Sequence, residues 1–169
     1  VGSKTTSLKS YSERQISPLR AATSGAPSSG AGGIDYLGHR LVPQPLRPII
    51  GEIKVNSDQN AFYALIQLLT YLSELALPKQ IERANRYSLF GEKVGSDTSF
   101  DLHILLADFN DRGKKGPIID QTRVIAEKFK YNLQQREPTV AARIGDILCL
   151  TMNSESFAAQ GEDRLLLRW

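Results

Sequence analysis

The sequence predicts an α/β domain in which a central mixed sheet of four or five strands is flanked by helices. Short apolar runs rich in β-branched residues alternate along the chain with longer segments of helical periodicity. The chain has 169 residues, of which 41% are hydrophobic, so one domain can bury a full core. The single cysteine excludes an internal disulfide framework and a four-cysteine zinc site.

The first 33 residues contain little that predicts a core element. Residues 1–10 are rich in Ser, Thr and Lys, and we expect a flexible end there. Residues 11–22 suit a short helix that either begins near Ser17 or kinks at Pro18. Residues 23–33, TSGAPSSGAGG, form a small-residue loop without packing capacity. We therefore expect one domain over residues 11–169, with this loop inside it.

The middle of the chain predicts two strands and a long helix. Residues 33–42, GIDYLGHRLV, alternate as a strand does, and the prolines of PQPLRP then suit a turn or an edge connection. Residues 49–55, IIGEIKV, are rich in β-branched side chains and predict a second strand. The segment NSDQN supplies N-cap residues, with Asp58 among them, for a helix over residues 60–77 that Pro78 ends.

The remaining elements complete an interleaved order. Residues 88–95 suggest a short hairpin, and residues 101–109 are apolar enough for a strand buried on both faces. Pro117 suits the first turn of a helix that reaches to about residue 135, and residues 142–153 predict one more strand. The order helix, strand, strand, helix, strand, helix, strand favours a sheet with helices packed on it.

Two charges interrupt the apolar strand at residues 49–55. Residues i and i+2 of a strand point to the same face, so Glu52 and Lys54 should project together and pair. Asp35 lies on the preceding strand, and if the two strands pair, its carboxylate can approach that of Glu52. Two carboxylates with waters suit Mg²⁺ or Mn²⁺, and Lys54 beside them could orient an attacking water.

The helix after this strand carries a polar stripe along a mainly apolar surface. The stripe consists of Tyr63, Gln67, Tyr71 and Glu74, at positions i, i+4, i+8 and i+11. A helix that is otherwise apolar must be mostly buried, so its polar stripe faces either solvent or a site. Gln67 and Tyr71 could reach over the sheet edge towards a phosphate.

These residues resemble the PD-(D/E)XK nuclease superfamily in GIDYLG, then GEIKV, then QLLTY, over roughly residues 11–108. The resemblance implies a restriction-endonuclease-like core of order αβββαβ. It implies that Asp35 and Glu52 bind Mg²⁺ or Mn²⁺, and that Lys54 positions the water. Its Gln-x-x-x-Tyr pattern is similar to that of RecB-type exonucleases, in which the glutamine contacts the active site. Ile34 stands where the family name has proline.

Many members of this superfamily add a glutamate from their first helix to the acidic cluster. Glu13 is the only acidic residue before Asp35, and it is therefore the sole candidate for that position. The loop DRGKKG contributes Arg112, Lys114 and Lys115 as candidate contacts to a phosphate backbone.

The leading interpretation is a metal-dependent nuclease domain that acts on DNA. One alternative is a catalytically inactive module of the same fold that binds DNA or a protein partner. Another is a structural domain in which the ion pair is incidental. The net charge of +3 permits nucleic-acid binding without requiring it.

The rest of the sequence excludes several other classes. His39 and His103 have no third partner at metal-ligand spacing, and Cys149 suits a small buried position. Neither a GxxxxGK[ST] phosphate loop nor a GxSxG elbow occurs. No run approaches the roughly 18 apolar residues of a membrane span, and no apolar signal segment begins the sequence. We expect a cytoplasmic or nucleoid-associated protein, neither secreted nor in a membrane, that belongs to a larger parent protein or forms a homodimer.

Overall fold

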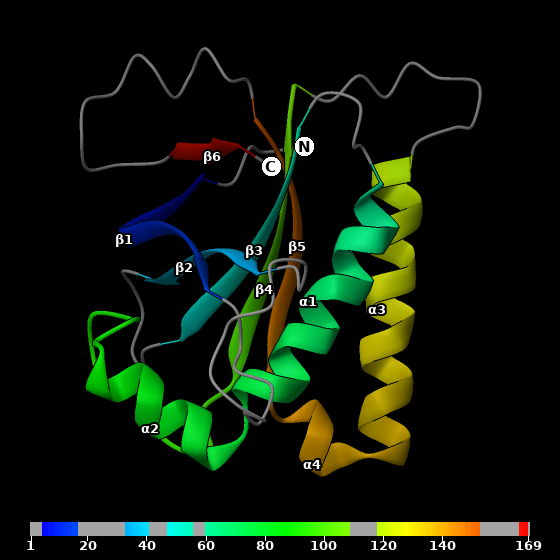
Figure 1. The fold of residues 1–169 in the computed structure, drawn as a ribbon. Coiled ribbons are helices and arrows are strands. Elements are labelled where there is room, and N and C mark those ends of the chain that lie inside the picture. Colours follow the sequence, from blue (N-terminus) through cyan, green and yellow to red (C-terminus); the bar gives the residue numbers. More distant parts are fainter. Residues whose placement is uncertain are drawn as a thin grey trace.

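A mixed β-sheet with helices on one face forms the centre of the computed structural model (Figure 1). The structure describes residues 5–16, 33–40, 47–55, 60–108, 118–152 and 166–168. Within them the order of the chain is β1 (Thr5–Ile16), β2 (Ile34–Arg40), β3 (Pro48–Val55), α1 (Ala61–Leu75), α2 (Pro78–Arg86), β4 (Phe100–Ala107), α3 (Ile118–Arg136), α4 (Pro138–Ala141), β5 (Ile144–Met152) and β6 (Leu166–Arg168). The α/β class predicted from the sequence is confirmed.

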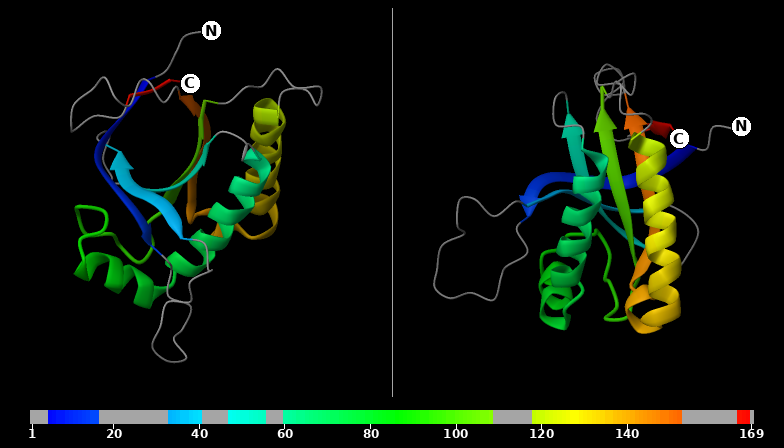
Figure 2. Two further views of the ribbon diagram at one scale, coloured as in Figure 1. Left: turned by 45° about the horizontal axis from the view of Figure 1, so that its top comes forward. Right: turned by 90° about the vertical axis from the view of Figure 1, so that its right-hand side faces the viewer.

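The four strands β2 to β5 make up the mixed sheet. β2 is antiparallel to β3, whereas β3, β4 and β5 run parallel to one another. Parallel neighbours need a crossover, and the helices supply it: α1 and α2 lead from β3 to β4, and α3 and α4 lead from β4 to β5. β1 and β6 continue the pairing beyond the predicted four or five strands and close it into a barrel. Figure 2 shows α1 and α3 side by side over one face of β3, β4 and β5.

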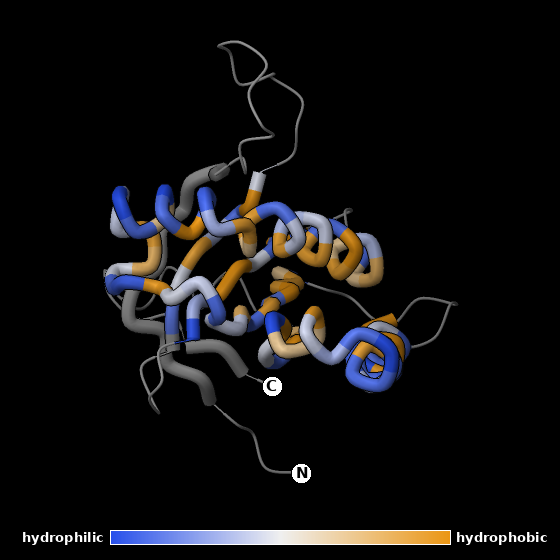
Figure 3. Tube along the Cα trace, turned by 90° about the horizontal axis from the view of Figure 1, so that it is seen from below, coloured by the Kyte–Doolittle hydropathy of each residue, from blue (hydrophilic) through white to orange (hydrophobic). Residues whose placement is uncertain are grey.

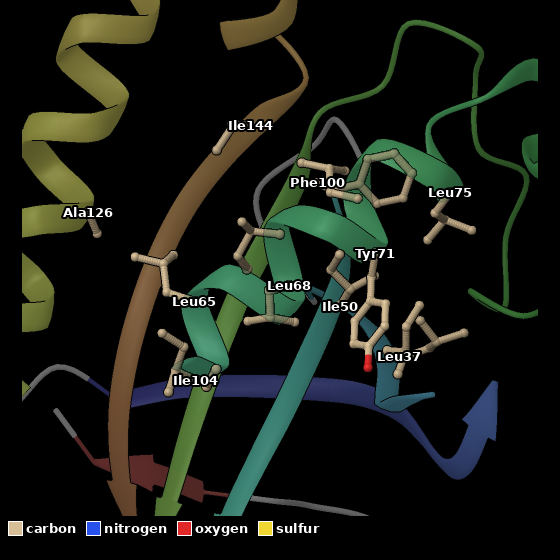
Figure 4. Packing of buried hydrophobic residues seen from close by; sticks show 14 of the residues in the cluster. Leu37, Ile50, Leu65, Leu68, Tyr71, Leu75, Phe100, Ile104, Ala126 and Ile144 are labelled. Atoms are coloured by element: carbon tan, nitrogen blue, oxygen red, sulfur yellow. The ribbon is translucent and has the colours of Figure 1, made fainter. Parts of the chain in front are cut away.

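The main core lies between these two helices and the sheet. Leu65 and Leu68 of α1 are fully buried and belong to one cluster with Ile50 of β3 and Ile104 of β4 (Figure 4). The helices alternate between hydrophobic and hydrophilic residues along each turn, as helices with one buried face do (Figure 3). Every residue of β4 is buried, which confirms the prediction of a strand covered on both faces.

A second, smaller cluster lies on the opposite face of the sheet. It consists of Tyr36, Ile49, Leu105 and Leu150, with Ile53 packed against it. Tyr36 is the partner of Gly51 across the β2–β3 ladder, and its ring occupies the space where a side chain at position 51 would lie. Position 51 therefore requires glycine, because any larger side chain would overlap the Tyr36 ring from the neighbouring strand.

Gly51→Ala should destabilise the fold strongly. An added Cβ would lie 1.7 Å from Cε1 of Tyr36, a ring that is itself fully buried. Overpacking of this kind costs about 1–3 kcal/mol or more of the free energy of unfolding, measurable by urea denaturation. Gly95→Ala is the matched control, because its nearest neighbour is the exposed Asp97 carboxylate, which can move. Equal stability of the two variants would contradict the packing of Tyr36 on Gly51.

The N-terminal segment differs from its prediction. Residues 5–10, expected to be a flexible end, and residues 11–16, expected to begin a helix, together form β1. This strand pairs with β2 on one side and β6 on the other, so the ladders satisfy the backbone groups of a segment rich in Ser and Thr. Residues 17–22 and most of the predicted loop at 23–33 lie outside the described residues.

The segment after α1 also differs from its prediction. Pro78 ends the first helix, as expected, but it also opens α2 as an N-terminal proline, and the two helices meet at 89°. Residues 88–95 form turns instead of a hairpin, with Ser88 and Gly91 at positive φ. The Asn85 side chain satisfies the backbone of Val94, which a paired strand would otherwise do. It accepts from the Val94 N–H at 2.8 Å and donates to the Val94 carbonyl at 2.9 Å.

Among the described residues, no single helix is long and apolar enough to cross a bilayer, although α1 and α2 taken together across their bend meet both criteria.

Candidate functional site

Glu52 and Lys54 project from β3 to the face of the sheet that α1 covers. The Lys54 ammonium donates to Oε1 of Glu52 at 2.9 Å. Both residues are buried, with Glu52 4% and Lys54 5% exposed. The intervening Ile53 packs against the cluster on the opposite face. The strand alternation that the sequence predicted for these charges is therefore confirmed.

Helix α1 places polar groups directly over Lys54. Oε1 of Gln67 accepts a second hydrogen bond from the Lys54 ammonium, also at 2.9 Å. Nε2 of Gln67 lies 3.5 Å from the Tyr71 hydroxyl, at the long limit of a hydrogen bond. Figure 4 shows Tyr71 reaching from α1 towards Leu37 of β2. Lys54 is thus held from β3 by Glu52 and from α1 by Gln67.

The start of α1 is fixed by a side-chain cap. Oδ1 of Asn60 accepts from the Tyr63 N–H at 2.9 Å, so a residue of the NSDQN segment caps the helix as expected. Asp58, which the sequence also offered as a cap, lies outside the described residues. The cap sets where the helix begins, and this determines which residues of its polar stripe stand above β3.

Asp35 lies at the start of β2, beside the charged part of β3. Its Oδ2 accepts from the backbone N–H of Ile53 at 2.7 Å, so the carboxylate is tied to the residue between Glu52 and Lys54. The ladder pairs Tyr36 with Gly51, and continuing it by one residue brings Asp35 opposite Glu52. Directly opposed residues in an antiparallel pair share a face. The two carboxylates therefore lie on the same side of the sheet.

The electrostatics of Glu52 agree with this arrangement. Burial raises the pKa of the Glu52 carboxyl, and the negative charge of Asp35 raises it further, while Lys54 and Gln67 act to lower it. Burial also raises the pKa of Tyr71, and both Glu52 and Asp35 contribute in the same direction.

One oxygen of the site lacks a donor. Oε2 of Glu52 is buried and has no hydrogen-bond partner among the described residues, whereas Oε1 receives the lysine. A buried anionic oxygen without a donor is costly unless a cation satisfies it. Glu52 and Asp35 are hard oxygen donors, and one or two carboxylates completed by water and phosphate oxygens are what Mg²⁺ commonly binds. The donor set therefore fits Mg²⁺ or Mn²⁺.

A third protein ligand is not found within the described ranges. No group of three or more His, Cys, Asp and Glu side chains converges in that part of the chain. Glu13 lies on β1, where its partner in the ladder is Tyr36, and the helix expected to carry it is a strand instead. The candidate DNA contacts Arg112, Lys114 and Lys115 lie outside the described residues.

Tyr63 was not among the site residues proposed from the sequence. Its ring lies over Lys54, with the ammonium 5.4 Å from the ring centroid, a distance at which a cation–π interaction is effective. Tyr63 is one turn before Gln67 on the polar stripe, and this i, i+4 spacing was the signal that could have identified it.

The other titratable groups singled out from the sequence lie in the interior. His39 and His103 are buried within β2 and β4, and Cys149 is a buried free cysteine in β5, as expected. A second buried charge, Asp101, was missed by the sequence interpretation. It accepts from the Asp146 N–H at 2.7 Å and from Arg47 at 3.2 Å, and so joins the starts of β3, β4 and β5.

The buried carboxyl of Glu52 should make stability depend on pH in a defined direction. Its pKa is raised from 4.5 in the folded state, so the folded protein retains this proton at pH values where the unfolded chain has lost it. The contribution of Glu52 to stability is therefore complete below pH 4.5 and is lost as the pH rises through the folded pKa. Relative to Glu52→Gln, the parent should lose free energy of unfolding over that range in urea titrations. Glu82→Gln, which removes an exposed carboxylate, is the control, and a parent that gains stability relative to Glu52→Gln would contradict the assignment.

Comparisons with protein families, with curated proteins and with solved structures found no match to this chain.

Proposed function

We propose that the site formed by Asp35, Glu52, Lys54, Gln67 and Tyr71 hydrolyses phosphodiester bonds of DNA with the help of a divalent cation. The same proposal extends to the fold: the β2–β3 hairpin, α1 and the parallel strand β4 would form a restriction-endonuclease-like core. β1 takes the place of the leading helix that this core would have.

The observation that carries the proposal is the position of the Lys54 ammonium. It is buried, it is held at 2.9 Å by acceptors from two different elements, and a second carboxylate lies on the same face of the sheet as its ion-pair partner. A purely structural ion pair needs one acid for one base. Here the Asp35 carboxylate lies on the same face of the sheet as this pair, and Oε2 of Glu52 has no hydrogen-bond donor among the described residues. Two carboxylates on the face that carries a fixed ammonium suit a site that binds a cation and a phosphate together.

The roles of the residues follow from these contacts. Asp35 and Glu52 would hold the cation, which supplies polarisation of the phosphate when it is bound. Lys54 would orient the attacking water and stabilise the negative charge that develops on the phosphate oxygens. The water oxygen forms a new bond to phosphorus and releases a proton to solvent, one P–O ester bond breaks, and the leaving oxygen takes up a proton from solvent. Gln67 would keep the ammonium in place, and Tyr71 would support Gln67.

A second candidate function is a module of the same fold that binds DNA or a protein partner without hydrolysis. It is favoured by one observation: no third acidic ligand joins Asp35 and Glu52 in the part of the chain that the structure describes. This candidate predicts binding without metal-dependent cleavage.

Incubation with linear and circular DNA in Mg²⁺, Mn²⁺ or chelator separates the two functions. The proposal predicts cleavage that requires the cation, and circular DNA distinguishes internal cleavage from attack at ends. Salt-sensitive DNA binding with no cleavage in either metal would support the binding module and contradict hydrolysis.

A further inference from the structure

We propose that Tyr63 stacks on an unpaired nucleobase next to the scissile phosphate, so that the preferred substrate is a single-stranded or frayed segment. This inference rests on the proposed function of the same site and names its substrate class.

Tyr63 lies between Lys54 and solvent. Its ring lies over Lys54 and is nevertheless 55% exposed, whereas Glu52 and Lys54 beneath it are almost wholly buried. The ring therefore forms the boundary between the buried ammonium and solvent. A phosphate that reaches Lys54 brings the neighbouring nucleotide to this ring.

Two further apolar side chains on α1 are exposed beside Tyr63. Phe62 and Ile66 are also exposed, and they lie on the first two turns of α1 next to Tyr63. Residues three and four apart are neighbours on a helix surface, so Tyr63 and Phe62 both adjoin Ile66. The three form an apolar rim beside a site whose other groups are charged or polar. The first turn of α1 contains no acidic residue that would repel a nucleic-acid backbone.

The chemistry of the rim selects an unpaired base. Aromatic side chains stack on the flat faces of nucleobases, and this contact tolerates every base because each has such a face. In a duplex these faces are covered by the neighbouring base pairs. A protruding ring beside the Lys54 ammonium therefore favours strands whose bases are unstacked.

The test measures binding in chelator, so that it does not depend on cleavage. The probes are a fluorescein-labelled oligothymidylate of about 12 nucleotides and a blunt hairpin duplex of similar charge. In fluorescence anisotropy, Tyr63→Ala should weaken binding of the single strand about 5- to 100-fold and change duplex binding about twofold or less. Tyr63→Phe, which keeps the ring, should bind as the parent does.

Two further variants make the result specific. Tyr131→Ala removes a tyrosine of similar exposure, 63%, from the far end of α3 and should leave both affinities unchanged. Tyr63→Leu keeps an apolar side chain without a ring. If Tyr63 only covers Lys54, this change would lower cleavage of both DNA forms equally and leave single-strand affinity intact, which would overturn the inference.

The outcomes separate the inference from the function on which it rests. Parent-like binding of the single strand by Tyr63→Ala, or an equal loss on both probes, overturns the stacking role even if the parent cleaves DNA. A selective loss in Tyr63→Ala, together with a parent that never cleaves, supports the stacking contact and contradicts hydrolysis. A parent that binds neither probe overturns the inference directly.

Discussion

Lys54→Met should reduce metal-dependent DNA cleavage by about 10²- to 10⁴-fold, the range expected for loss of a positioned proton-transfer or charge-stabilising group. The ammonium donates to both Glu52 on β3 and Gln67 on α1. Methionine fills a similar volume but donates no hydrogen bond, so the proposed positioning group of the water would be lost. The measurement is the initial rate of cleavage in Mg²⁺ on the substrate that the parent cleaves fastest.

The same substitution should also destabilise the fold, and a second variant separates the two effects. Removing one partner of a buried ion pair leaves the other charge unpaired and costs about 3–5 kcal/mol. The double variant Glu52→Gln with Lys54→Met removes both charges and should recover most of this free energy of unfolding. It should remain inactive. A folded Lys54→Met protein that cleaves DNA at the parent rate would exclude Lys54 from the mechanism.

Asp35→Asn should lower metal-dependent cleavage at least about 100-fold while leaving the fold nearly intact. The amide oxygen can still accept from the Ile53 N–H, which in the parent donates to the Asp35 carboxylate at 2.7 Å. The negative charge is lost, and with it the proposed ligand for the cation. Cleavage rates and urea denaturation, measured on the same preparations, check both parts.

Two controls define the Asp35 result. Asp35→Ala removes the acceptor as well. Its free energy of unfolding should be about 1–3 kcal/mol lower than that of Asp35→Asn, because the hydrogen bond from the Ile53 N–H is lost. Asp97→Asn removes an exposed carboxylate in the turn before β4 and should behave as the parent does. Parent-like cleavage by Asp35→Asn would show that this carboxylate does not serve the reaction.

Much of the site could be predicted from the sequence because strand and helix geometry fix which residues share a face. Alternation on a strand is enough to place Glu52 and Lys54 together. The i, i+4 spacing on α1 is enough to place Gln67 and Tyr71 on one stripe. The apolar run of β4 and the proline before α3 likewise predicted these elements within one or two residues of their ends.

The parts that could not be predicted depend on partners distant in the chain. β1 has no apolar alternation of its own, and its strand form comes from pairing with β2 and with β6, at the other end of the sequence. The hydrogen bond from Ile53 to Asp35 depends on the β2–β3 register. The position of the Tyr63 ring over Lys54 depends on the angle at which α1 crosses β3, which no local pattern records.

Calorimetric titration of Mn²⁺ into the parent protein, beside Asp35→Asn and Glu52→Gln, tests the central claim most directly. The claim is that these two carboxylates bind one divalent cation together. It predicts a single saturable binding event in the parent that is weakened at least about tenfold in each variant, since each loses one of two charged ligands. A parent that gives no heat beyond dilution, or variants that bind Mn²⁺ as the parent does, would contradict it.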